Sequence, residues 1–277
     1  MADDMYKSEK IKNRYRYSLI LLRQLVITDF KLRYQGSALG YVWSLLRPLF
    51  LFIILYFVFV KFLRFGSDVP HFPVYLLAGI VLWNFFAEIT TTSINAIVER
   101  GALIRKLNFP KYVIIMATAV SALINLVLNS VVIMIFMAIN HVEFTWNLLW
   151  VPLYTVEIFV FALSLGFILS ALFVRLRDIG YIWEVAMQGL FYATPIIYPL
   201  SMVSKEWPEV AKILLLNPVA QAIQDIRYLA ITPETQTLSG ITNHRGMVLV
   251  PIILVVVTTL IAVVLFKKRS PLFAEEV

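Results

Sequence analysis

Long apolar segments follow one another through most of the chain and are separated only by short polar stretches. The hydrocarbon core of a bilayer is spanned by a helix of roughly 20 apolar residues, so each long segment predicts a transmembrane helix. The pattern predicts six spans, at 39–60, 74–97, 112–139, 148–174, 179–198 and 248–266. The expected fold class is therefore an all-α integral membrane protein.

The apolar stretch at 201–231 has a different character. Pro208 and Pro218 divide it into pieces of about ten residues, which are too short to cross a bilayer. We expect a re-entrant helical hairpin here, on the outward side between the fifth and sixth spans. The expected organisation is an N-terminal segment at 1–38, a membrane domain at 39–266 and a tail at 267–277.

An apolar stripe precedes the first span and is formed by Leu19, Leu22, Val26 and Phe30. Its spacing of three or four residues predicts an amphipathic helix that lies along the membrane interface. Two interpretations fit this helix. It could be a lipid-surface anchor, or it could be a helix associated with a gate or a partner protein.

Basic residues are distributed unevenly between the two predicted sides of the membrane. Eighteen of the 24 lysines and arginines lie on the side that holds both termini, which predicts that both termini are cytoplasmic. A hydrophobic content of 60% and a mean hydropathy of +0.82 exclude a soluble domain of this size. The net charge of +7 is then attributed to topology and anionic lipid rather than to nucleic acid.

The loop after the second span, at 99–111, is short and basic and ends near Pro110. On a short helix its apolar residues would form a ridge with cations around it, which suits docking into a groove on a cytoplasmic partner. The alternative is an ordinary basic loop that only sets topology. The residues expected to contact a partner are Arg100, Leu103, Ile104, Arg105, Lys106 and Leu107.

Polar side chains within the spans are costly and need partners. Glu88, Glu157 and Glu184 fall inside predicted spans, where an ionised group at the centre costs at least about 2.5 kcal/mol. We expect them to form a buried polar network, with a proton relay as the alternative. Asn125 and Asn129, four residues apart, are expected to hydrogen-bond between helices.

Aromatic residues are abundant, with 20 Phe, 13 Tyr and 6 Trp, and many would form an interfacial belt. Some lie well inside the predicted spans and could present ring faces to a channel. These candidates are Trp83, Phe85, Phe86, Phe191 and Tyr192.

Motifs for catalysis are absent from the sequence. It contains no cysteine, no H-E-x-x-H, no G-x-S-x-G and no G-x-x-x-x-G-K-[ST] phosphate loop. Its three histidines, His71, His141 and His244, fall in predicted outward loops, so we expect no catalytic residue, metal site or cofactor on this chain. If ATP drives its activity, the ATPase is another chain.

Two stretches carry a resemblance to a known family. Residues 28–49 read TDFKLRYQGSALGYVWSLLRPL, and ATPIIYP at 193–199 is followed by LNP at 216–218. These stretches, in this order along the chain, resemble segments of the membrane subunits of type-2 ABC exporters for cell-surface polysaccharides. This family includes O-antigen, capsule, teichoic acid and rhamnan exporters. The similarity in layout covers nearly the whole chain.

The resemblance implies a homodimer with two cytoplasmic ATPase subunits, which bind ATP and Mg and move a lipid-linked glycan outward through the cell membrane. The loop at 99–110 would be the coupling helix, with Arg177 and Asp178 as a second contact. Residues 19–34 would be a gate helix where the lipid pyrophosphate enters. Ring faces in the channel would let sugar rings slide. The residues implied to contact the lipid head group are Phe30, Lys31, Arg33, Tyr34 and Arg47. The basic residues among them are equally well explained as charges that set the topology.

Two other functions remain as alternatives. A proton-coupled secondary transporter could use the intramembrane glutamates, but such proteins usually carry two related halves, and the sequence shows no such repeat. A membrane-embedded glycan transferase would need a cluster of catalytic carboxylates, and Glu206 and Glu209 are the nearest approach to one.

Overall fold

Helices supply the regular secondary structure of this protein. The computed structural model describes residues 2–34, 37, 40–66, 68–107, 109–242 and 244–276, without the side chains of 2–15, 33, 34, 41 and 245. About 82% of the chain is helical, and no strand occurs within those ranges. The all-α prediction is therefore confirmed.

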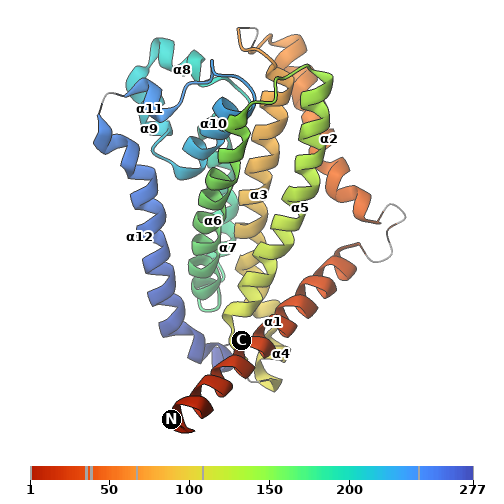
Figure 1. Cartoon of the computed structure of the whole chain (residues 1–277), viewed down its shortest axis with the longest axis vertical. Coiled ribbons are helices and arrows are strands. Elements are labelled where there is room, and N and C mark those ends of the chain that lie inside the picture. The colour runs from red at the N-terminus through yellow and green to blue at the C-terminus, as the bar shows by residue number, and fades with distance from the viewer. Residues whose placement is uncertain are drawn as a thin grey trace.

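Five helices in the described part of the chain are long and apolar enough to cross a membrane, and they run side by side (Figure 1). They correspond to the predicted spans one, two, three, four and six. They are α2 (Trp43–Leu55) continued by a π-helix (Tyr56–Phe62), α3 (Phe72–Glu99), α5 (Tyr112–Ile139), a 3-10 turn (Trp146–Trp150) leading into α6 (Val151–Phe173), and α12 (Arg245–Arg269).

The fifth predicted span is a shorter helix, α7 (Ile179–Ala193). Its 15 residues extend about 22 Å at a helical rise of roughly 1.5 Å per residue, less than a bilayer core of about 30 Å. The helix ends because Thr194 precedes Pro195, and a residue before proline is driven out of the helical region; Thr194 is extended, with φ −88° and ψ 131°. The full count of six spans stays a prediction.

Helix α3 occupies the centre of the bundle, and most of its surface is buried by α5, α6, α7 and α2. Small residues permit close contact with α6. A Cβ added at Gly166 would lie 2.7 Å from the hydroxyl of Ser93. Ser93 shares a 3.1 Å hydrogen bond with Thr118 on α5. Small and hydroxylated residues therefore bring three helices together, as is common inside membrane bundles.

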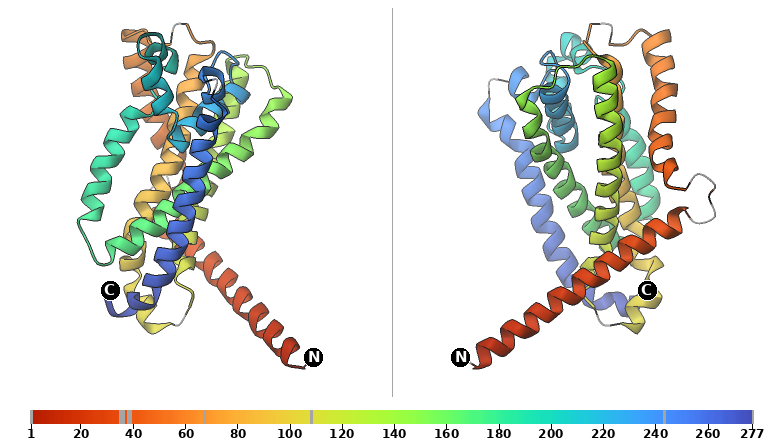
Figure 2. Two further views of the ribbon diagram at one scale, coloured as in Figure 1. Left: turned by 90° about the vertical axis from the view of Figure 1, so that its left-hand side faces the viewer. Right: turned by 45° about the vertical axis from the view of Figure 1, so that its right-hand side comes forward.

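The N-terminal helix α1 (Ala2–Tyr34) is longer than the predicted amphipathic segment, and it runs obliquely to the bundle with its first residues projecting away (Figure 2). Its later part packs on α5. The predicted stripe is wrong in register, because Leu19 is exposed while Ser18 and Leu25 are buried. Leu22 and Val26 do pack inward, so the contact face lies about one residue from the predicted one.

The segment predicted as a hairpin forms three short helices, α8 (Leu200–Glu206), α9 (Pro208–Leu214) and α10 (Pro218–Ala230). Both prolines stand at the first helical position, where the missing N–H costs nothing. Asn217 caps α10 by accepting a 3.0 Å bond from the backbone N–H of Val219. Helix α10 is largely buried against α6 and α3, so it enters the bundle.

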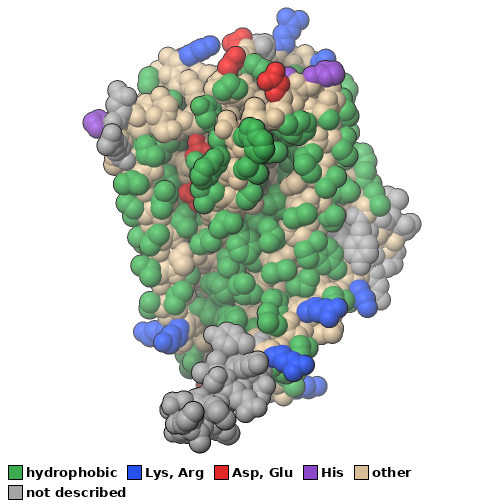
Figure 3. All heavy atoms as spheres, viewed as in Figure 1, with side chains coloured by type: hydrophobic (Ala, Val, Ile, Leu, Met, Phe, Trp, Pro, Cys, Tyr) green, Lys and Arg blue, Asp and Glu red, His purple; other side chains and the backbone are tan. Residues whose placement is uncertain are grey.

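The charged side chains visible at the lower end of the view in Figure 3, beyond a broad apolar belt, are lysines and arginines, whereas acidic and basic side chains occur together at the upper end. We call the lower end the basic end. It comprises α4 (Gly101–Lys106), the start of α5, the end of α12 and the short C-terminal helix α13 (Phe273–Glu276), which packs on α4. The opposite end carries α8, α9 and α11 (Leu238–Ile241).

Candidate functional site

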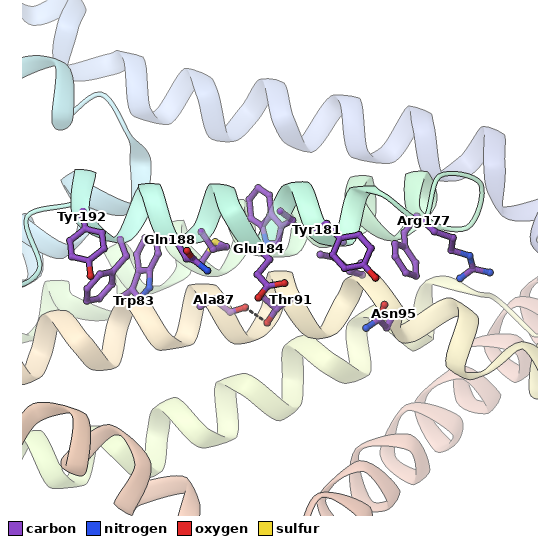
Figure 4. Close-up of a pocket in the computed structure, with 15 residues that line it drawn as sticks. Trp83, Ala87, Thr91, Asn95, Arg177, Tyr181, Glu184, Gln188 and Tyr192 are labelled. Atoms are coloured by element: carbon purple, nitrogen blue, oxygen red, sulfur yellow. Dashed lines mark hydrogen bonds between the residues drawn. The ribbon is translucent and has the colours of Figure 1, made fainter.

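A groove of about 850 Å³ runs between α3 and α7 (Figure 4). On α3, four lining residues recur at intervals of four, which places them on one helical face: Trp83, Ala87, Thr91 and Asn95. On α7 the lining residues include Tyr181 and Tyr192, which are largely exposed. The groove is therefore open along its α7 side.

Three of the five predicted channel aromatics line this groove. Trp83 meets Phe191 edge to face at 5.9 Å, and Phe191 contacts Tyr192 in the same way. The prediction is wrong for Phe85 and Phe86, which are 3% and 2% exposed. Both stack on aromatic rings of α6, and Phe86 also contacts Trp83, with 5.5 Å between the ring centres, because residues three apart lie on the same face of a helix.

Polar groups are interspersed with these rings. Glu184 points from α7 toward Thr91 on α3, and Gln188 lies one turn further along (Figure 4). At the basic end of the groove, the guanidinium of Arg177 sits 5.1 Å from the centre of the Phe173 ring, a cation–π distance. Aromatic ring faces beside exposed acidic and basic side chains can contact a polymer that carries many hydroxyl groups, without binding it at fixed points.

The three intramembrane glutamates lie in different surroundings and do not form one network. Glu88 on α3 accepts a 2.8 Å bond from the side-chain amide of Asn125 on α5. Glu157 on α6 interacts electrostatically with Asp225 on α10, whereas Glu184 lines the groove. Within the part of the chain that the structure describes, Glu88 has the interhelical hydrogen bond, and no chain of hydrogen bonds joins it to Glu157 or Glu184.

The two asparagines act between helices, as their spacing predicts. Asn125 bonds Glu88 on α3, and the amide of Asn129 donates to the carbonyl of Ser44 on α2 at 3.3 Å. Asn129 also donates to the carbonyl of Asn125 at 2.8 Å. These bonds connect α2, α3 and α5 at the middle of the bundle.

Helix α4 presents a different face from the predicted one. Ile104 is buried, and Leu103 packs with it against Val98, Val113 and Phe273. The predicted ridge is therefore wrong for Ile104, which attaches α4 to its own chain, while Leu103 is only partly buried and its contact with a partner stays a prediction. The outward face of α4 and the residue after it consists of Ala102, Arg105, Lys106 and Leu107.

Arg100, also predicted to meet a partner, instead forms an ion pair with Asp29 of α1. The two side chains are only 17% and 20% exposed. Arg100 is the residue directly before α4, so the pair ties the start of this helix to α1. The other predicted contact, Arg177 and Asp178, lies exposed in the turn between α6 and α7.

The predicted head-group residues are partly described. Phe30 is half-buried, while Lys31 on α1 and Arg47 on α2 are exposed. None of these three lines the groove between α3 and α7. The side chains of Arg33 and Tyr34 lie outside the described residues.

Arg227 of α10 is the most completely buried cation among the described residues, and the sequence analysis did not single it out. Its Nε donates to the carbonyl of Tyr75 at 3.0 Å, and its guanidinium lies 3.7 Å from that ring's centre. Its two Nη atoms donate to the carbonyls of Pro195, at 2.6 Å, and Ile196, at 2.9 Å. Gln224 accepts a longer bond at 3.3 Å. Arg227 thus joins α10 to α3 and to the link after α7.

Gly79 on α3 makes room for this arginine, and its replacement is a direct test. A Cβ there would lie 2.0 Å from Nη2 of Arg227, whose hydrogen bonds hold it in place. We expect Gly79→Ala to lower the free energy of unfolding by about 1–3 kcal/mol. The matched control is Gly189→Ala on α7, where a Cβ meets nothing within 4 Å and should stabilise the helix by about 0.5–1 kcal/mol. Thermal unfolding in detergent measures both, and equal behaviour would contradict the steric role of Gly79.

Comparison with known proteins identifies the family. The family model described as "ABC-2 type transporter" matches residues 20–231. The chain belongs to the ABC-2 type transporter family. The matched range contains the packed part of α1, the groove, α4 and all of α10.

The named relatives of this ABC-2 protein are O-antigen export permeases and a polysialic acid transport protein. The O-antigen export system permease protein RfbA of Myxococcus xanthus is 29% identical over 83% of this chain and 88% of its own length. A Klebsiella pneumoniae protein of the same name is 27% identical, covering 97% and 99%. The polysialic acid transport protein KpsM of Escherichia coli is 22% identical, covering 94% and 97%.

The family match confirms two predictions from the sequence. This ABC-2 chain is a multi-pass membrane protein, and it is a transport component rather than an enzyme. The expectation that it resembles a permease for polysaccharide export agrees with the names of its relatives.

Proposed function

We propose that this chain is the membrane subunit of an ATP-driven exporter that moves a lipid-linked cell-surface polysaccharide, such as an O-antigen, from the cytoplasmic to the outer side of the cell membrane. The observation that carries the proposal is the groove between α3 and α7, whose walls alternate aromatic rings with polar groups. Relatives named as O-antigen permeases support the substrate class.

The groove is open along α7, and a second copy of the chain would close it. Tyr181, Ile182 and Val185 on α7 are largely exposed, so this face is free to pack against the same face of a second copy. In a homodimer with the conduit between its two α7 helices, each subunit would cover this face of the other. Trp83, Phe191 and Tyr192 would then supply ring faces over which sugar rings pass.

In this proposal the basic end lies in the cytoplasm, because basic residues flank membrane spans on that side. Both termini are then cytoplasmic, and α8 and α9 face outward. Two ATPase subunits, which carry ATP and Mg, bind the outward face of α4, with Arg177 and Asp178 as a second contact. Lys31 and Arg47, both exposed, would attract the pyrophosphate of the lipid-linked substrate.

The coupling role of α4 gives the test of this function. In the double variant Arg105→Glu/Lys106→Glu, we expect ATP-dependent export in proteoliposomes to fall about tenfold or more, because two reversed charges would face the ATPase. The fold should persist, since both side chains are exposed. The matched control reverses Lys205 and Lys212 at the opposite end of the bundle. Normal export in the α4 variant would refute the coupling face.

The proton-coupled alternative is distinguished in the same vesicles. An ATP-driven exporter stops with vanadate and continues when a protonophore collapses the proton gradient. A transporter using Glu88, Glu157 or Glu184 does the reverse. The separate surroundings of these glutamates favour the ATP-driven function.

A further inference from the structure

A second cavity, of about 830 Å³, opens at the basic end. It lies where α1, the start of α5 and the end of α12 meet, and it shares no residue with the groove. We call it the α12 pocket. Its lining residues are Tyr17, Phe109, Pro110, Lys111, Tyr112, Phe167, Ala262, Val263, Phe266, Lys267, Ser270 and Pro271.

The floor of the α12 pocket is apolar and well packed. Phe109 and Phe266 are buried, and Phe266 meets Phe167 of α6 edge to face at 4.8 Å. Ala262 and Val263 continue this wall along α12, about 6–8 Å deeper into the span than Lys267 at the helical rise of about 1.5 Å per residue. The wall therefore extends from the basic end toward the membrane interior.

The rim of the α12 pocket is cationic. Lys111 and Lys267 line it, and none of its lining residues is acidic. Neither lysine forms an ion pair with any described residue, whereas Lys205 pairs with Asp68 and Lys212 with Glu209 at the opposite end. The hydroxyls of Tyr17, Tyr112 and Ser270 add hydrogen-bond donors at the same rim.

We propose that the α12 pocket binds an anionic phospholipid of the membrane leaflet at the basic end. The phosphate lies between Lys111 and Lys267, and an acyl chain follows Ala262, Val263 and Phe167. Two unneutralised cations above an apolar wall match the two parts of such a molecule, and basic pockets between membrane helices are suited to anionic head groups. The bound lipid contacts α1 through Tyr17, so it would fix α1 against α5 and α12.

The site is assigned to a membrane lipid rather than to the exported molecule because it is separate from the groove and contains none of the residues implied for substrate entry, such as Lys31 and Arg47. The inference depends on membrane insertion and not on the transported substrate. The inference would still hold if the proposed identification of the substrate as a polysaccharide were wrong.

The test is native mass spectrometry of the purified full chain equilibrated with phosphatidylglycerol or phosphatidylcholine. We expect the wild type to retain phosphatidylglycerol in preference to phosphatidylcholine, and Lys111→Gln/Lys267→Gln to lose that preference about tenfold. The control Lys268→Gln/Arg269→Gln removes the same charge from neighbouring positions outside the pocket and should retain it. Equal loss in both double variants would overturn the pocket, because it would indicate diffuse surface attraction.

A second variant tests the apolar wall with all charges present. Val263 is 60% exposed, so Val263→Trp should fold normally while filling the α12 pocket, and we expect it to lower phosphatidylglycerol retention. Unchanged retention would overturn the assignment of the acyl chain. A polyprenyl pyrophosphate that displaces phosphatidylglycerol and binds more tightly would instead make this a site for the substrate lipid and overturn the proposal.

Discussion

Replacing Arg227 with methionine is expected to lower the melting temperature of the detergent-solubilised protein by about 10 °C or more. The substitution leaves the buried carbonyls of Pro195 and Ile196 without their donor, and it removes a second bond from the carbonyl of Tyr75, which lies within α3. An unsatisfied buried acceptor costs about 1–3 kcal/mol. Each kcal/mol corresponds to a shift of roughly 2–4 °C for a domain of about 150–250 residues. The loss should loosen α10 from the bundle first, because Arg227 is its deepest anchor.

Two further variants separate the geometry of Arg227 from its charge. Arg227→Lys keeps the cation but cannot donate in three directions from a planar fork, so we expect an intermediate loss. Lys205→Met removes an exposed cation, 70% accessible, at the same end and should leave the melting temperature unchanged. If Arg227→Met unfolds at the wild-type temperature, the carbonyls of Pro195 and Ile196 have other partners and Arg227 is not an anchor.

Reversing the charge of Arg100 is expected to reduce ATP-driven export about tenfold or more. Arg100→Asp would place a second carboxylate beside Asp29 in a setting where both side chains are mostly buried. Breaking a buried pair leaves an uncompensated charge and costs about 3–5 kcal/mol, so α1 should separate from the start of α4. Because α4 carries the proposed ATPase contact, this separation would interrupt the path from ATP hydrolysis to α1.

The swapped variant, Asp29→Arg/Arg100→Asp, restores opposite charges and should recover most of the export rate. The matched control is Lys205→Asp, which disrupts the exposed pair with Asp68, 70% and 80% accessible, and should have little effect. Failure of the swap to recover export, with normal amounts of protein in the membrane, would count against the ion pair as the link between α1 and α4.

The sequence predicts the membrane helices well because each long span is a single apolar run bounded by polar residues. The predicted fifth span is longer than α7, because the apolar residues continue through Ile196 and Ile197 after Thr194 and Pro195 have ended the helix. The contact face of α1 is displaced because apolar residues are too frequent between 19 and 27 for spacing to select one stripe. Leu19 and Leu25 are equally apolar, and only packing on α5 buries the second.

The candidate site is predicted less completely, because its residues depend on which helices become neighbours. Trp83 and Phe86 are both aromatic residues of one span, yet one faces α7 and the other stacks on Phe161 of α6. Arg227 gave no signal because three of its hydrogen-bond acceptors are backbone carbonyls from distant segments, which cannot be recognised from side-chain composition. The prediction that Ile104 contacts a partner failed for a related reason, because an apolar residue on a surface helix can face its own chain as well as a partner.

The measurement that tests the central claim most directly is co-purification of the tagged chain with its ATPase subunit, followed by ATP turnover with and without lipid-linked glycan. The exporter account predicts a stable complex with two copies of each subunit, whose ATP turnover changes when the glycan is added. A chain that purifies alone and transports in response to a proton gradient, without ATP, would contradict it.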